Sequence, residues 1–111
     1  MNKLEKDPTQ TFDETLQNWY GQLDTFINTE EKDKAGKDFS AWAAEVNLNY
    51  LTPLEMLFNE QFSGGSPVKF PLLDTNPKTK KDDHLKKLKA IRYNIFNYQR
   101  QAYLNSMGDL S

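Results

Sequence analysis

The sequence predicts an all-α fold, a single-domain bundle of about four helices. Apolar residues recur every three or four positions in four stretches, at residues 11–28, 37–50, 53–62 and 83–106. Most of the prolines lie in one long connection ahead of the last stretch. With 111 residues, of which 13% are aromatic, the chain can bury a core of its own, so we expect one helical domain over residues 1–111.

The first predicted helix, residues 11–28, has the clearest signals. Thr11 and Glu14 have the spacing of a capping box, which sets the start of the helix. We expect residues 1–10, ahead of this cap, to fray. With residues placed about 100° apart, the apolar side chains share one side of the helix: Phe12, Leu16, Trp19, Tyr20, Leu23, Phe26 and Ile27.

The second predicted helix, residues 37–50, follows a polar connection and carries Phe39, Trp42 and Val46 on one side. Thr52 and Pro53 then predict a new start, with Thr52 as N-cap, Pro53 at the first helical position and Glu55 closing the box. We therefore expect a separate third helix, residues 53–62, that ends at Ser63-Gly64-Gly65-Ser66. Its expected buried residues are Leu54, Leu57, Phe58 and Phe62.

The connection at residues 63–82 has an unusual composition. Pro67, Pro71 and Pro77 exclude a helix, yet apolar residues are too frequent for a free linker. A structureless connection of about 20 residues is uncommon in a compact domain. We therefore expect an extended segment packed on the bundle, with Phe70 and Leu73 buried. The alternative is a partner-binding loop, which an exposed edge of Phe70 would favour.

The last predicted helix, residues 83–106, is the longest, with Asp82 or Asp83 as its cap. One side of it is apolar and the other carries a basic stripe. The expected apolar side consists of Leu85, Leu88, Ile91, Ile95, Phe96, Tyr98, Ala102 and Tyr103.

Charge is divided along the chain. Residues 1–66 hold twelve acidic residues against five Lys or Arg, a net charge of −7, whereas residues 67–111 hold nine Lys or Arg against four acidic residues, a net charge of +5. The total of −2 hides this division. Such a division concerns partners and solubility more than fold.

Material for catalysis is scarce. The chain has no cysteine and one histidine, His84, so thiol chemistry is excluded and a metal site would lack converging ligands. Asp82 and Asp83 beside it are more simply helix-start residues. Ser63 to Ser66 lacks the Gly-Lys-Ser/Thr ending of a phosphate loop. We expect no cofactor, no metal and no enzymatic activity.

Cellular placement follows from the same composition. The start of the chain lacks the apolar run of a secretory signal, and no segment reaches the ~18 apolar residues of a membrane span. We expect a cytoplasmic protein that does not bind membranes.

The sequence therefore predicts a small adaptor or inhibitor that acts by protein–protein contact. Its expected partner-binding residues are Glu30, Glu31 and Asp33 in the acidic half and Phe70 in the connection. Attraction between the acidic half of one copy and the basic half of another would give self-association. The alternative is a nucleic-acid-binding accessory subunit that uses the basic last helix. The residues expected to serve it are Lys78, Lys80, Lys81, Lys86, Lys89, Tyr93, Asn97 and Arg100.

Overall fold

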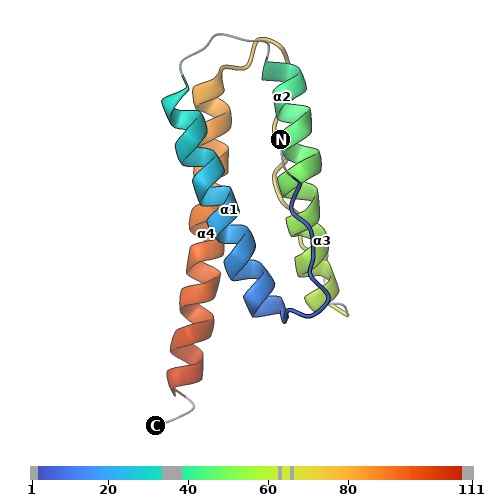
Figure 1. Ribbon diagram of the computed structural model, residues 1–111, viewed down its shortest axis with the longest axis vertical. Helices are drawn as coiled ribbons and strands as arrows, with labels where there is room; N and C mark the ends of the chain where they lie inside the picture. Colours follow the sequence, from blue (N-terminus) through green and yellow to red (C-terminus); the bar gives the residue numbers. More distant parts are fainter. Residues whose placement is uncertain (1–2, 34–38, 63, 66, 109–111) are drawn as a thin grey trace.

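Three long helical rods make up the fold in the computed structural model, which describes residues 3–33, 39–62, 64–65 and 67–108. Helix α1 spans Phe12–Lys32, and helix α4 spans Lys81–Gly108. Helix α2 (Phe39–Val46), the π-helical turn η1 (Asn47–Leu51) and helix α3 (Thr52–Gln61) follow one another without a break and form the third rod. Figure 1 shows α1 beside α4, with the α2–α3 rod on the other side of the core.

The all-helical prediction is confirmed, but the number of helices is not. Residues 37–50 and 53–62 were expected to form two separate helices. In the described part of the chain they belong to one continuous rod, which gives three rods instead of four helices. The start predicted at residue 37 lies outside the described residues. Helix α1 runs four residues beyond its predicted end, to Lys32. Helix α4 begins at Lys81, so Asp82 and Asp83 occupy its first turn and do not cap it.

The capping box at the start of α1 forms as the sequence predicts. The Thr11 hydroxyl accepts a hydrogen bond from the Glu14 backbone N–H at 3.2 Å. In return, Glu14 Oε1 accepts the Thr11 backbone N–H at 3.0 Å. These two bonds satisfy N–H groups that have no partner within the helix.

Pro53 does not start a new helix. The π-helical turn before it makes room for the proline ring, and the N-terminal segment supplies the hydrogen bond that the proline cannot donate. At η1 the Thr52 N–H bonds to the Asn47 carbonyl five residues back, which widens the helix before the proline. Pro53 has no N–H to give the Asn49 carbonyl. The Leu4 N–H supplies that bond from outside the helix, at 2.9 Å.

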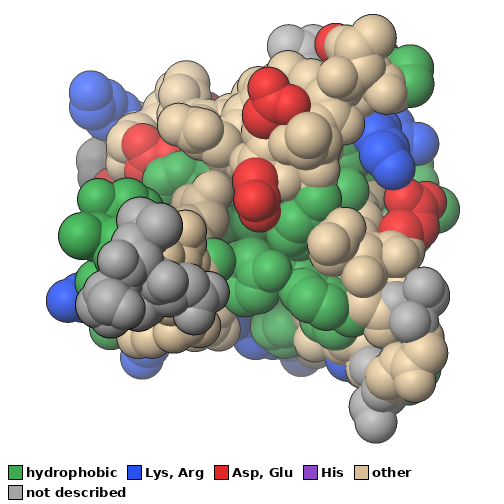
Figure 2. All heavy atoms as spheres, turned by 90° about the horizontal axis from the view of Figure 1, so that it is seen from below, with side chains coloured by type: hydrophobic (Ala, Val, Ile, Leu, Met, Phe, Trp, Pro, Cys, Tyr) green, Lys and Arg blue, Asp and Glu red, His purple; other side chains and the backbone are tan. Residues whose placement is uncertain are grey.

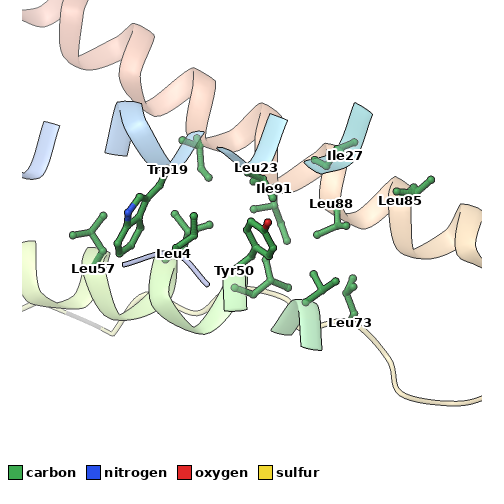
Figure 3. Packing of buried hydrophobic residues seen from close by; sticks show 14 of the residues in the cluster. Leu4, Trp19, Leu23, Ile27, Tyr50, Leu57, Leu73, Leu85, Leu88 and Ile91 are labelled. Carbon is green, nitrogen blue, oxygen red and sulfur yellow. The ribbon is translucent and has the colours of Figure 1, made fainter. Parts of the chain in front are cut away.

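The same bond places the N-terminal segment in the fold, although residues 1–10 were expected to fray. Leu4 is 2% exposed and packs between helices as a core residue. Figure 3 shows it beside Trp19 of α1 and Leu57 of α3. The Trp19 indole N–H donates to the Glu5 carbonyl at 3.2 Å, so the large ring holds the segment as well as the helices.

The core runs along the space between the three rods and is almost entirely apolar. Its least exposed members come from every rod, and α1 and α4 contribute buried residues on successive turns of their inner sides (Figure 3). Four residues expected in it lie elsewhere: Ala102 is exposed, and Phe62, Phe96 and Tyr103 are 41%, 47% and 65% exposed. The last two belong to a part of α4 whose apolar side turns away from the core. The fully enclosed core residues include Leu16, Leu23, Ile27, Leu51, Leu54 and Leu88.

Candidate functional site

The acidic residues predicted to bind a partner lie against α4. Glu30 Oε2 is 3.2 Å from the Lys81 ammonium. Lys81 also donates to the Asp33 backbone carbonyl at 2.8 Å. Glu31 forms an ion pair with Lys89, which lies about two helical turns after Lys81 on α4. The three acidic positions therefore meet two of the lysines that were assigned to nucleic-acid binding.

A third basic side chain extends this contact toward the middle of α1. Arg92 Nη1 donates to Asp24 Oδ1 at 2.9 Å and to Asn28 Oδ1 at 3.4 Å. Exposed ion pairs stabilise a fold by only ~0–1 kcal/mol each. The side chains of Lys81 and Glu30 are only 12% and 15% exposed. Removal of either one would therefore leave the charge of the other unpaired and poorly solvated. Opposite charges of the two halves of the chain thus meet within one molecule.

The predicted basic stripe is therefore shorter than the sequence suggests. Lys81 and Lys89 contact α1, and Asn97 is half-buried. Lys86, Tyr93 and Arg100 are spaced by seven residues, which places them on one side of α4. The predicted members that are exposed are Lys78, Lys80, Lys86, Tyr93 and Arg100.

His84 is buried in the core next to Trp42. Its side chain is 1% exposed, the two rings are 5.7 Å apart, and His84 Nε2 has no hydrogen-bond partner among the described residues. Burial lowers the pKa of His84 below its usual 6.5; the nearby Asp74 carboxylate partly opposes this shift, and the Lys87 ammonium adds to it. His84 is therefore a neutral core residue at neutral pH.

We expect the free energy of unfolding to fall as the pH drops from 7.5 to 5.5. Because burial makes the pKa of His84 lower in the folded chain than in the unfolded chain, the unfolded chain binds the proton first as the pH falls, and acid favours the unfolded state, by at most ~1.4 kcal/mol per pH unit. Urea unfolding at both pH values measures this. His84→Gln should flatten the dependence, since no other side chain has its ordinary pKa in that window. Equal stability of the natural chain at both pH values would contradict the assignment.

The segment of residues 67–76, here called the strap, is extended and lies along the α2–α3 rod (Figure 1). Asn59 binds both backbone groups of Val68: its amide donates to the Val68 carbonyl at 3.1 Å, and its Oδ1 accepts the Val68 N–H at 2.7 Å. Asn47 binds Leu73 in the same way, at 2.9 and 2.7 Å. These paired bonds replace the partners that a β-sheet would provide.

Between these two anchors, Glu55 Oε2 accepts the Phe70 N–H at 2.9 Å. Glu55 was expected to close a capping box with Thr52, and in the continuous rod that role does not arise. Leu73 is buried, as predicted, whereas Phe70 is half-buried against Phe58, with ring centroids 5.6 Å apart. No sequence signal marks Asn47, Glu55 and Asn59 as anchors, because their partners lie 9 to 26 residues away.

An apolar groove of about 250 Å³ lies between the strap and α4. Phe70 and Pro71 form its wall on the strap, and Asn94 and Tyr98 lie on the α4 side. Lys69 is exposed at its rim. The remaining lining residues are Phe58, Val68, Ile91 and Ile95.

Aromatic rings continue from this groove over the lower end of the bundle. Tyr98 packs edge-on against Phe58 and Phe62, with centroids 5.4 and 5.9 Å apart, and Phe12 packs against all three rings. Figure 2 views this end and shows hydrophobic side chains gathered at its centre, with acidic side chains above and to the right of them and basic side chains at the edges of the view. Because Phe62 is 41% exposed, the cluster reaches the surface.

Carboxyl groups with shifted pKa values belong to turns and caps. Hydrogen bonds from nearby threonines lower the pKa of each: Thr9 bonds to Asp7, Thr11 to Glu14 and Thr79 to Asp74. A lowered pKa is the opposite of what a general acid needs at neutral pH. Ser63 and Ser66 of the glycine turn lie outside the described residues.

Over the described ranges, no group of three or more His, Cys, Asp or Glu side chains is arranged to hold a metal ion. No described helix combines the length and the apolar character needed to cross a membrane. Comparison with known proteins gave no match to this chain, among protein-family models, curated proteins or solved structures.

Proposed function

We propose that this chain is a non-enzymatic protein-binding module, an adaptor or inhibitor, that receives an apolar side chain of another protein in the groove between the strap and α4. The observation that carries the proposal is the groove itself, an apolar hollow whose strap wall includes the half-buried Phe70. Exposed apolar surface next to a hollow is typical of protein-binding sites.

The charge around the groove indicates which partner it suits. Lys69 lies at the rim, and Lys87 is exposed one helical turn before Ile91 on α4. A segment with an aromatic or aliphatic residue flanked by acidic residues complements both features. The acidic positions Glu30, Glu31 and Asp33 support the proposal less, because they already contact α4 or its lysines.

Nucleic-acid binding has less support than protein binding. Lys81 and Lys89 are engaged with α1, which leaves four exposed cations in the predicted set, Lys86 and Arg100 on α4 and Lys78 and Lys80 ahead of it. Each phosphate contact adds to affinity and to salt dependence, so the loss of Lys81 and Lys89 from the set reduces the electrostatic contribution that α4 could make.

Selection from a displayed peptide library tests the proposed site. We expect enrichment of peptides in which an apolar residue lies between acidic residues. Asn94→Trp, which fills the groove from α4, should abolish their binding, and Lys69→Glu should weaken it about tenfold, a change of about 1.4 kcal/mol. The matched control is Gln101→Trp, seven residues further along the same side of α4 and outside the groove.

Fluorescence anisotropy with an enriched peptide gives the dissociation constants. Amide chemical-shift changes should concentrate at Val68, Phe70 and Asn94. A library that yields no enriched peptide, or peptides that bind the Asn94→Trp variant as tightly as the natural chain, would refute the proposed site.

A further inference from the structure

Helix α4 extends past the helices that pack against it. The first residue of α1, Phe12, packs against Tyr98, with ring centroids 6.1 Å apart. Every residue of α4 from Arg100 to Met107 is exposed, a length of about 12 Å at 1.5 Å per residue. Figure 1 shows this end of α4 projecting below the other two rods. Two turns of helix without packing are marginal in water, so this end would gain stability from a partner.

The projecting end and the turns before it carry an apolar stripe on one side. Positions 93, 96, 100, 103 and 107 are separated by alternating steps of three and four residues, the spacing of a helix-pairing seam. Four of these side chains are large and apolar or aromatic, with exposures between 47% and 65%: Tyr93, Phe96, Tyr103 and Met107. The fifth is Arg100, which is also exposed.

A groove runs beside the stripe where α1 begins. It measures about 500 Å³, and Asp13 and Gln17 of α1 line it together with residues of α4 that include Tyr103. Asp13 is exposed and lies close to α4. Burial raises the pKa of Tyr98, and the negative charge of Asp13 raises it further. The groove thus offers a carboxylate next to the apolar stripe.

The stripe of one copy is complementary to the stripe of a second copy that runs in the opposite direction. When two copies are set antiparallel about a point between positions 101 and 102, Phe96 meets Met107 of the other copy, and Arg100 meets Tyr103. Sulfur–aromatic and cation–aromatic contacts are both favourable. Each Arg100 also comes close to the groove that holds Asp13 of the other copy. A parallel arrangement would place the two Arg100 side chains together, which is repulsive.

We propose that a second copy of this chain binds here, so that residues 96–107 of α4 form an antiparallel, two-fold symmetric helix pair. Two-fold dimers are the commonest soluble assemblies, and their interface uses the same patch on both copies. The pairing side of α4 differs from the side that lines the groove under the strap, so the two proposals stand independently.

Sedimentation equilibrium over a concentration series tests the pairing. We expect a monomer–dimer equilibrium for the natural chain and a dissociation constant raised at least tenfold by Tyr103→Glu or Met107→Glu. Met56→Glu is the matched control, because Met56 is 59% exposed on α3, away from the stripe. These side chains are exposed, so far-ultraviolet circular dichroism should confirm an intact fold in each variant. A natural chain that stays monomeric at millimolar concentration overturns the proposal.

Two further experiments test the register. Arg100→Glu should weaken pairing, and adding Asp13→Arg to that variant should restore it. Since the chain has no cysteine, Phe96→Cys and Met107→Cys chains can be mixed in equal amounts and oxidised. Antiparallel pairing predicts mainly the mixed disulfide between the two variants, whereas a majority of Phe96→Cys disulfide homodimers would contradict it.

Discussion

Replacing Trp19 by alanine is expected to lower the free energy of unfolding by about 3–5 kcal/mol. The indole is 3% exposed and packs against Leu4 and Leu57, so its removal leaves a large cavity between α1 and α3. It also removes the hydrogen bond to the Glu5 carbonyl, one of the contacts that hold the N-terminal segment. The total free energy of unfolding of a typical domain is only about 5–15 kcal/mol, so this variant should be close to unfolding at 37 °C.

Urea unfolding followed by circular dichroism measures this effect. Leu48→Ala serves as the control, because Leu48 is 59% exposed and its truncation should change stability by less than about 0.5 kcal/mol. A loss below about 1 kcal/mol for Trp19→Ala would show that the ring is not part of the core.

Replacing Asn47 by alanine is expected to lower the free energy of unfolding by about 2–6 kcal/mol and to loosen the strap. The substitution leaves both the N–H and the carbonyl of Leu73 without their partners, and each unsatisfied buried group costs about 1–3 kcal/mol. Because Leu73 is 3% exposed, water cannot replace the lost bonds unless the strap moves away from the helix. Asn47→Asp keeps the acceptor and loses the donor, so its effect should be intermediate.

Amide hydrogen exchange distinguishes a loosened strap from a general loss of stability. The Leu73 amide should lose protection in Asn47→Ala under conditions where the amides of α1 keep theirs. The control is Asn94→Ala, an exposed asparagine on α4. An unchanged rate for Leu73 would mean that Asn47 does not anchor the strap.

Local patterns in the sequence were sufficient for the outline of the fold. The capping box at Thr11 and Glu14 forms as predicted because both partners lie within one turn. The apolar period placed Leu23 and Leu88 in the core, since a helix that buries one side must repeat every three or four residues. The same period failed near the end of α4, where the apolar side continues after the neighbouring helices have ended.

Long-range contacts account for what the sequence could not predict. Pro53 predicts a helix start, and nothing near it in sequence shows that the Leu4 N–H, 45 residues before Asn49, provides the bond that the Asn49 carbonyl lacks. Likewise, the sequence does not show that Glu30 meets Lys81 of α4, because 51 residues separate the two. The groove under the strap depends on Asn47 and Asn59, which are ordinary polar residues in sequence. Each of these features requires two distant parts of the chain to be placed together before it can be recognised.

The pairing of α1 with α4 has a consequence for synthesis of the chain. Asp24 and its partner Arg92 are 68 residues apart. At 5–20 residues per second, a ribosome needs roughly 3–14 s to make that length. During this interval the side of α1 that later packs on α4 stays uncovered on the nascent chain, including Tyr20, whose ring lies 6.5 Å from that of Phe96. Completion of this fold therefore waits until α4 has been synthesised.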